Sequence, residues 1–274
     1  MIIGDCLCQK NASFEKYFEF KNETVFKNYK GIIIGKCTNC GLLKTFPNKN
    51  LKHIPQPSRD LFYEKNRRFF EGLFRPVVDK ITSYKKTGKV LDIGCSSGIL
   101  LQLLKNKGFD VYGIEPDKKA YLTASKKFKA KIFFGFLEGF AKKTKNKFDI
   151  IIYNHVLEHI DDVLNEIKLS KSILNKNGIL TIGVPNTGNI IFSLRKKYWE
   201  SLMPNEHIWH FSTEYLVNLL KDQGFKILNV SFSDDKRLDY PFYKRLYFSV
   251  LSLINKLCHT GEAVLIIAFL DNNS

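Results

Sequence analysis

Long apolar runs are missing from this chain of 274 residues. No stretch approaches the roughly 18 to 20 uncharged apolar residues that a membrane-spanning helix needs. The first ten residues, MIIGDCLCQK, lack the basic region and following apolar segment of a secretion signal. Because 44% of the residues are hydrophobic, the chain can still form an ordinary core. We therefore expect a globular protein of the cytoplasm with no transmembrane segment.

Acidic residues are also few, with 27 Asp and Glu against 43 Lys and Arg, which gives a formal net charge of +16. Such a surplus favours an anionic partner, which could be a nucleic acid, a membrane surface or a phosphorylated metabolite. The lysines are spread along most of the chain, as on solvated helix faces, and the basic run at 195–197 is short. No aromatic and basic RNA-binding pattern occurs, so a small anionic molecule is the expected partner.

The six cysteines do not suggest a disulfide framework in a chain of this size without a secretion signal. Four of them form two close pairs, Cys6 with Cys8 and Cys37 with Cys40, and Gly41 follows the second pair. Two such pairs can place four thiolates at the corners of a tetrahedron, which predicts a structural zinc ion in a small β-rich ribbon. The first pair is one residue shorter than the usual CxxC, and four reduced thiols or a redox pair are the alternatives.

The chain is expected to divide at about residue 58. Residues 42–58 contain three prolines and little periodicity, which predicts a linker after the ribbon. A helical stretch follows at 59–84, where Pro76 predicts a break or kink. We expect a ribbon and linker over 1–58 and a second domain over 59–274, with a lid insertion at about 187–212 and a helical insertion at about 240–260.

Strands and helices alternate from Gly88 onward. Short apolar runs predict strands at 89–93, 109–114, 130–134, 148–153, 179–185, 225–232 and 263–270. Repeated alternation implies right-handed crossovers, so the predicted fold is α/β with a doubly wound, seven-stranded, mostly parallel sheet. The insertion at 240–260 could cover the substrate site, form an oligomer, touch a membrane surface or simply pack against the domain.

A glycine-rich turn, Gly94-Cys95-Ser96-Ser97-Gly98, follows the first of these strands and precedes a helix. Small residues let the backbone approach a nucleoside, and the helix presents its positive N-terminus. Glu115 lies 23 residues after Asp92, at the end of the second strand, where a carboxylate can accept both hydroxyls of a ribose. Turn and acid together predict a site for a nucleoside cofactor. A dinucleotide would favour GxGxxG, whereas this turn is DxGxSxG.

The turn resembles the first motif of the class I S-adenosylmethionine-dependent methyltransferases, an acidic residue followed by GxGxG, with Ser96 replacing the middle glycine. The resemblance spans about 88–232 and includes the blocks FDIIIYNHVLEHIDD and NGILTIGVPN. It implies that S-adenosylmethionine is the cofactor, with its ribose on Glu115. The residues that it implies around the rest of the cofactor are Asp92, Gly94, Cys95, Ser96, Gly98 and Asn154 near the methionine part, Pro116 beside Glu115, and Phe136 and Leu137 at the adenine.

The segment His155-x-x-Glu158-His159 has the spacing of an inverted zinc-protease motif. A protease motif lies within a helix and needs a third ligand, whereas this segment directly follows a predicted parallel strand. We therefore expect a loop that faces the cofactor, and zinc only at the cysteines. His159 either reaches the acceptor as a base or supports the next helix through Asp161 or Asp162, and His155 is expected to be structural.

A second group of histidines and aromatic residues occurs at 203–212, in the expected lid. Its pattern EHxxxFS, together with the cysteine ribbon, resembles zinc-ribbon methyltransferases that act on nucleotide-linked sugars. That resemblance implies His207 as the catalytic base, assisted by Glu206, and a loop that is merely packed is the alternative. The expected function is O-methylation of a small anionic acceptor: a sugar, a nucleotide-linked sugar or a phosphorylated precursor of a cell-surface polysaccharide. An RNA or protein methyltransferase and a non-catalytic, methyltransferase-like binding protein are the alternatives.

Overall fold

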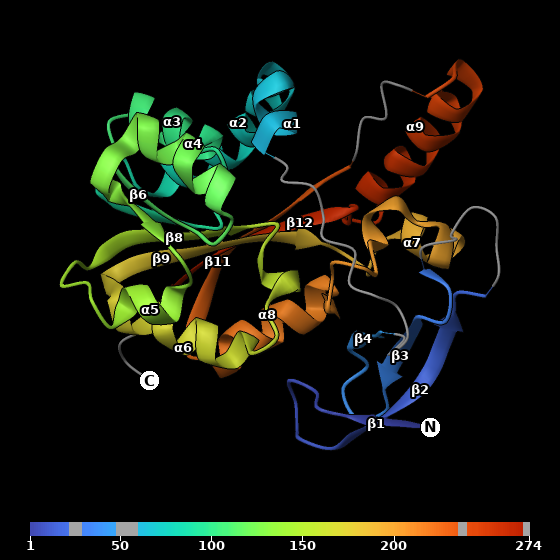
Figure 1. Ribbon diagram of the computed structural model, residues 1–274. Coiled ribbons are helices and arrows are strands. Elements are labelled where there is room, and N and C mark those ends of the chain that lie inside the picture. The colour runs from blue at the N-terminus through green and yellow to red at the C-terminus, as the bar shows by residue number, and fades with distance from the viewer. Residues whose placement is uncertain (22–28, 48–59, 235–239, 271–274) are drawn as a thin grey trace.

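The computed structural model describes residues 1–21, 29–47, 60–234 and 240–270, which form two β-sheets and the helices that cover them (Figure 1). The larger sheet has seven strands in the order β11-β12-β9-β8-β5-β6-β7. Its strands are β5 (Lys89–Ile93), β6 (Asp110–Glu115), β7 (Ile132–Phe134), β8 (Phe148–Asn154), β9 (Leu174–Pro185), β11 (Phe225–Ser233) and β12 (Ala263–Leu270). The seven-stranded sheet predicted from the sequence is confirmed.

The strands from β5 to β9 pair in parallel, and β12 is inserted antiparallel between β9 and β11. From β5 the chain moves to β6 and β7 on one side and then returns to β8 and β9 on the other side. The carboxyl ends of β5 and β8 therefore border the crevice in which open α/β sheets bind their ligands.

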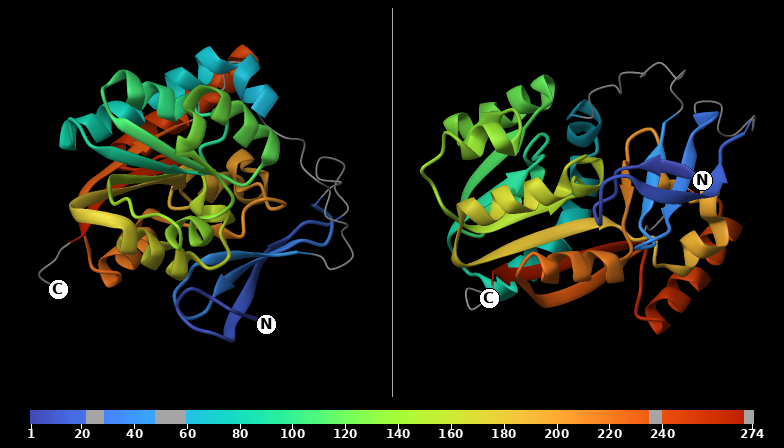
Figure 2. Two further views of the ribbon diagram at one scale, coloured as in Figure 1. Left: turned by 60° about the vertical axis from the view of Figure 1, so that its left-hand side comes forward. Right: turned by 90° about the horizontal axis from the view of Figure 1, so that it is seen from below.

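Helices cover both faces of the large sheet, which Figures 1 and 2 show as three layers. One layer contains α1 (Asp60–Lys65), α2 (Arg67–Tyr84), α3 (Ile99–Asn106) and α4 (Lys118–Phe128), and the other contains α5 (Leu137–Ala141), α6 (Val163–Ile173) and α8 (Thr213–Asp222). In β8, Ile150 and Ile152 pack on the first layer while Ile151 and Tyr153 pack on the second, and all four are fully buried. A strand covered on both faces has no solvent side, which explains its continuous apolar sequence.

The helices begin and end largely where the sequence predicts. Asp117 caps α4, because its Oδ1 accepts a hydrogen bond of 2.8 Å from the backbone N of Ala120. The helix α2 runs through Pro76 without a break, and the helical stretch is interrupted at Asn66 instead. Proline removes a single helical hydrogen bond, and the buried Val78 and Ile81 keep the next turn of α2 packed against the sheet.

The smaller sheet is antiparallel, with strand order β1-β2-β3-β4-β10. Its strands are β1 (Ile2–Gly4), β2 (Ala12–Glu19), β3 (Ile33–Cys37), β4 (Leu43–Phe46) and β10 (Trp209–His210). The prediction of a linker from residue 42 was wrong for β4, where Leu43 and Thr45 are buried and pair with β3. The rest of that expected linker, residues 48–58, lies outside the described residues. Because β10 comes from the expected lid, this segment completes the N-terminal sheet.

The two insertions also pack against the N-terminal sheet. The first contains α7 (Ile190–Arg195) and the 3-10 turns η4 (Lys196–Tyr198) and η5 (Glu200–Leu202), and the second is α9 (Phe242–Leu257). Ile191, Trp199 and Phe248 share one buried cluster with Phe20 and Ile34 of the small sheet. The outward side of α9 exposes a row of large apolar residues, which are Phe242, Tyr243, Leu246, Tyr247, Val250, Leu253 and Leu257. No helix among the described residues is long and apolar enough to cross a membrane.

Candidate active site

A cavity of about 990 Å³ lies at the carboxyl ends of β5 and β8. Its walls come from the turn after β5, the ends of β8 and β9, the start of β12 and one side of α1 and α2. The lining residues are Tyr63, Phe70, Leu73, Phe74, Val77, Asp92, Gly94, Cys95, Ser96, Ser97, Ile99, Leu100, Asn154, His155, Gly183, Met203, Ser233, Ala263, Val264 and Leu265. The cavity therefore occupies the position that the sheet topology predicts for a ligand.

The turn after β5 is held in a left-handed conformation. Gly94 has φ of 70°, and a Cβ atom there would lie 2.6 Å from Cγ2 of Val156, so a larger residue would not fit. Ser96 has φ of 47°, which costs a non-glycine residue about 1 kcal/mol. Its backbone N donates a hydrogen bond of 2.7 Å to Oε2 of Glu115, and this bond fixes the turn. Serine is thus tolerated where the related motif has glycine.

Two carboxyl groups are buried at the ends of adjacent strands. Asp92 is 3% exposed and Glu115 is 6% exposed. Burial raises the pKa of Asp92, and the nearby charge of Glu115 raises it further. Burial also raises the pKa of Glu115, while hydrogen bonds from the backbone N of Asp117 and of Ser96 oppose that rise. Acids with perturbed pKa values beside a cavity are typical of functional sites.

The structure brings together only part of the predicted cofactor site. Asp92, Gly94, Cys95, Ser96 and Asn154 line the cavity, and Glu115 adjoins it through its bond to Ser96. The predicted residues that do not line it are Gly98, Pro116, Phe136 and Leu137. The Phe136 ring is 71% exposed whereas Leu137 is buried within the core. The roles predicted for these residues at the adenine stay predictions.

The cover formed by α1 and α2 was not predicted from the sequence. Tyr63 and Phe70 place their ring centroids 4.2 Å apart, and Phe74 and Val77 continue the same wall of the cavity. The helical spacing of these apolar residues did indicate a buried helix face. It could not indicate that this face closes a cavity, because that depends on where the helix packs.

Behind the cavity wall, side chains from two distant segments meet. His159 lies in η3 (Leu157–His159) and His207 lies in the lid, and their ring centroids are 4.7 Å apart. The carboxylate beside them is Glu158, whose Oε1 lies 4.0 Å from Nε2 of His207 and 3.5 Å from Nδ1 of His155. The sequence had suggested Glu206 as the assisting acid. In the structure the backbone carbonyl of Glu206 accepts a hydrogen bond of 2.9 Å from Nδ1 of His159.

Hydrogen bonds to backbone carbonyls tie these two segments together. The backbone N of Ile208 donates to the carbonyl of Glu158 at 2.9 Å, and Nε1 of Trp209 donates to the carbonyl of Ile160 at 3.0 Å. Asp162 caps α6 itself by accepting a hydrogen bond from the backbone N of Asn165. The lid segment and the turn after β8 thus form one support for the cluster.

His210, three residues beyond His207, has a structural role. Its Nε2 is 2.8 Å from Oγ1 of Thr45, so the side chain links β10 to β4. Complete burial lowers the pKa of His210 to about 3, which keeps the imidazole neutral at physiological pH.

The four N-terminal cysteines are brought together as predicted from their spacing. Their sulfur atoms lie within 4.8 Å of one another, with Cys6 and Cys40 3.5 Å apart and Cys8 and Cys37 3.7 Å apart. Gly41 has φ of 76° and its N donates to the carbonyl of Cys37, which forms the expected tight turn. Four sulfur ligands at such distances fit a tetrahedral zinc ion after a small contraction.

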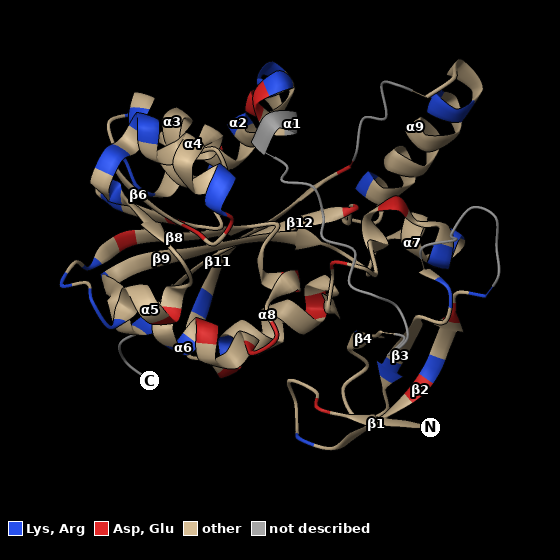
Figure 3. Cartoon of the chain, viewed as in Figure 1, with Lys and Arg blue, Asp and Glu red and all other residues tan. Residues whose placement is uncertain are grey.

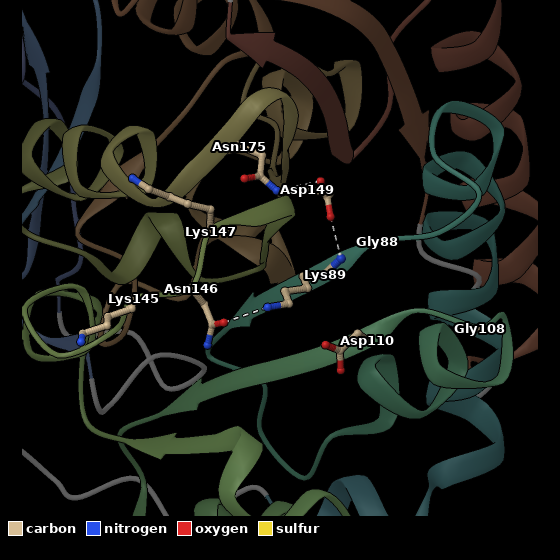
Figure 4. A pocket seen from close by; sticks show the side chains of 9 residues that line it. All are labelled: Gly88, Lys89, Gly108, Asp110, Lys145, Asn146, Lys147, Asp149 and Asn175. Carbon is tan, nitrogen blue, oxygen red and sulfur yellow. Dashed lines mark hydrogen bonds between the residues drawn. The ribbon is translucent and has the colours of Figure 1, made fainter.

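A second hollow, of about 550 Å³, lies at the opposite, amino edge of the large sheet (Figure 4). There the carboxylate of Asp149 accepts hydrogen bonds from the backbone N of Lys89 and from Nδ2 of Asn175, each at 2.8 Å. Nζ of Lys89 in turn donates to Oδ1 of Asn146. Because these groups are hydrogen-bonded to one another, we interpret them as a network that stabilises the ends of the strands.

Lys and Arg are absent from the described residues that line the cavity of about 990 Å³. In the view of Figure 3, Lys and Arg are distributed over α2, α4, α9 and the small sheet. This distribution agrees with the spread of lysines along the sequence and gives the site no marked cationic rim.

Comparison with known proteins agrees with the fold. The family described as "Methyltransferase domain" matches residues 63–230. The "Ubiquinone biosynthesis O-methyltransferase" of Pelagibacter ubique is 38% identical over 104 residues, which is 37% of this chain and 43% of that protein. The human mitochondrial protein of the same name is 27% identical over 158 residues, which is 52% of this chain and 42% of that protein. The chain thus matches less than half the length of these curated relatives.

Solved structures show the same architecture. A "SAM dependent methyltransferase" from Archaeoglobus fulgidus superposes with a TM-score of 0.57 and 22% identity over 76% of this chain and 98% of its own. The "magnesium protoporphyrin IX methyltransferase" of Synechocystis, with bound S-adenosylhomocysteine, gives a TM-score of 0.53 and 19% identity over 76% of this chain and 86% of its own. The chain therefore belongs to this family of methyltransferase domains and has the fold of the class I S-adenosylmethionine-dependent methyltransferases.

Proposed function

We propose that this chain methylates an oxygen atom of a small acceptor, with S-adenosylmethionine held at the carboxyl edge of the large sheet. The observation that carries the proposal is the cavity of about 990 Å³ at that edge, beside which Asp92 and Glu115 are buried. The absence of side chains at Gly94 and Gly98 keeps the turn close to the cavity, and a Cβ atom at either glycine would meet a neighbouring side chain at 2.6 Å or less.

Within this site each residue has a defined task. The carboxylate of Glu115 now accepts two backbone N–H groups, and its second lone pairs suit the hydroxyls of a ribose. Asp92 and Asn154 supply polar atoms beside the turn for the amino acid part of the cofactor. When bound, S-adenosylmethionine supplies a methyl group on a sulfonium, whose sulfur keeps the bonding electrons when the methyl group leaves. The protein orients the acceptor oxygen in line with that bond and excludes water.

A hydroxyl acceptor must also lose its proton as the new carbon–oxygen bond forms. Beyond the residues that line the cavity, the titratable cluster of Glu158, His159 and His207 lies behind the lining residue His155, which is 3.5 Å from Glu158. The curated relatives are named O-methyltransferases, which supports oxygen as the accepting atom. The comparisons do not support the sugar or polysaccharide acceptor expected from the sequence, and the anionic character of the acceptor stays a prediction.

We also propose that Cys6, Cys8, Cys37 and Cys40 hold a structural zinc ion. All four sulfurs are ligands, so a tetrahedral ion would have no open position and no part in the reaction. The division near residue 58 stays a proposal too, with the addition that β10 joins the second part of the chain to the first. An oligomer formed through α9 and a cytoplasmic location remain predictions from the sequence.

Calorimetric titration with S-adenosylmethionine tests the proposed function. We expect Glu115→Ala to weaken binding at least about tenfold, because a charged hydrogen bond contributes about 1.5 to 3 kcal/mol. Asp149→Asn, at the amino edge, is the matched control and should bind as the wild type does. The proposal fails if Asp92→Ala and Glu115→Ala both bind the cofactor unchanged. Transfer of a labelled methyl group to a panel of phenols, sugars and sugar phosphates would then identify the acceptor class.

A further inference from the structure

We propose that Glu158, His159 and His207 bind a divalent transition-metal cation that positions the acceptor oxygen. One ligand atom from each residue lies within 4.8 Å of the others. Three atoms that each bind one ion at about 2.1 Å are separated from one another by about 3.0 to 3.6 Å. A contraction of at most about 2 Å, within the range of side-chain rotations, would close the three residues on an ion.

The state of Glu158 is the main argument for a cation. Its side chain is 2% exposed, and neither carboxylate oxygen accepts a hydrogen bond from any residue that the structure describes. An ionised carboxylate without a partner is costly to bury. The nearest positive groups would be the imidazoles of His155 and His207, at 3.5 and 4.0 Å, which are beyond hydrogen-bond distance. A cation between Glu158 and the two ring nitrogens would supply the missing partner.

The orientation of His159 is that of a metal ligand. A carbonyl oxygen only accepts hydrogen bonds, so the contact with the carbonyl of Glu206 means that Nδ1 of His159 carries the proton. The lone pair is then on Nε2, at the other side of the ring. A backbone carbonyl that fixes the tautomer and rotation of the ring is the usual outer partner of a metal-binding histidine. The backbone N of His207 donates to the carbonyl of Met203, which holds the turn that carries this residue.

The donor set indicates the kind of ion. Two imidazole nitrogens and one carboxylate suit zinc, iron(II), cobalt(II) or manganese(II) and are a poor match for calcium. Three protein ligands leave positions open, unlike the four cysteines. His155 is half exposed, contacts Glu158 and lines the cavity, so the open side is the side from which an acceptor would come.

This inference rests on the proposed function for its chemical meaning. A divalent cation lowers the pKa of a hydroxyl that it contacts. The hydroxyl proton could then pass to solvent before the methyl carbon bonds to the oxygen. In this assignment His207 acts as a ligand, and the base expected from the sequence is not required. The segment HVLEH, which lacks a third ligand in the sequence, obtains it from residue 207.

Cobalt binding to the full chain tests the proposal without measuring activity. Protein purified with zinc, so that the cysteines are filled, is dialysed against cobalt(II), and the bound cobalt is counted by mass spectrometry. We expect one added cobalt per wild-type chain, with an absorption spectrum free of thiolate charge transfer. Glu158→Gln and His207→Asn should weaken cobalt binding at least about tenfold, while His259→Asn, an exposed histidine after α9, should not.

The proposal is overturned if the wild type gains no cobalt, or if all three variants bind it as the wild type does. Circular dichroism identifies a variant that has not folded. In that case the cobalt content and absorption spectrum of the wild type, together with the variant that does fold, decide the test. Calorimetry with S-adenosylmethionine on the same samples separates the two proposals. Cofactor binding without cobalt binding overturns only the metal site, whereas cobalt binding without cofactor binding overturns only the proposed function.

Discussion

The four cysteines and the cluster of Glu158, His159 and His207 both place metal-binding atoms within 4.8 Å of one another, but they differ in closure and in origin. The cysteine cluster has four ligands, all within the N-terminal sheet and its turns. The second cluster has three candidate ligands and a buried carboxylate that accepts no hydrogen bond among the described residues, and it contacts His155, which lines the cavity. A closed set of ligands can only hold the fold together, whereas an open set can also hold a reactant. The comparison predicts that damage to the first lowers stability and damage to the second lowers activity.

The largest effect is expected at the cysteines. Cys37→Ser removes one of the four proposed zinc ligands, and a structural zinc ion contributes several kcal/mol to the folded state. We expect the melting temperature to fall by about 10 °C or more in thermal unfolding. Cys258→Ser, an exposed cysteine at the end of α9, is the control. Equal melting temperatures for Cys37→Ser and the wild type would show that the cysteine cluster does not stabilise the fold.

The next effect is expected at Glu158. Glu158→Gln should reduce the rate of methyl transfer about a hundredfold, because activation of the acceptor oxygen contributes that much or more. The affinity for S-adenosylmethionine should stay unchanged, since Glu158 does not line the cavity. In the presence of a chelator the variant should melt no lower than the wild type, because the substitution removes a buried carboxylate whose oxygens accept no hydrogen bond among the described residues. A fall in melting temperature with unchanged turnover would give the residue a structural role instead.

The smallest effect concerns Glu166 in α6, a half-buried acid that accepts a hydrogen bond. The hydroxyl of Tyr153 donates to it at 3.3 Å, and burial raises the pKa of Glu166 to about 7 despite that bond. The ordinary pKa is 4.5, so the folded state binds the proton more tightly than the unfolded state. The resulting stabilisation is complete below about pH 4.5 and is lost as the pH rises through about 7.

Because the side chain is partly exposed, we expect the free energy of unfolding to fall by only about 1 to 2 kcal/mol over that range. Urea unfolding between pH 4.5 and 8 would measure this fall. In Glu166→Gln the same range should show a smaller slope. A slope that is identical in the two proteins would assign the pH dependence to other groups.

The sequence predicted best those features that depend on neighbouring residues. The strand, glycine turn and helix around Gly94 are encoded by local apolar spacing and by backbone freedom, and they occur at the predicted positions. The cysteines of each pair are separated by only one or two residues, so the two thiolates of a pair cannot lie far from each other. This spacing indicates a metal site. The prediction was less good for β4, whose four residues become a strand only because β3 and β10 lie beside them.

The active site depends on longer distances along the chain. Glu158 lies in the segment HVLEH, and the neighbouring sequence offers no third metal ligand. His207 lies 49 residues later, and only the packing of the lid on the turn after β8 brings it to 4.0 Å from that carboxylate. The cavity wall formed by α2 was not predicted for the same reason, because it depends on how α2 packs against residues far away in the chain.

By itself the sequence determined the order of strands and helices, the position of the glycine turn and its acidic partner, and the two close pairs of cysteines. These follow from hydrophobic spacing and from short separations, which any fold of the chain must respect. The tertiary structure alone decided which acid faces His207, what closes the cavity and that the lid completes the N-terminal sheet. Each of these depends on contacts between residues far apart in the chain, which form only when the two sheets and their helices bury a shared core.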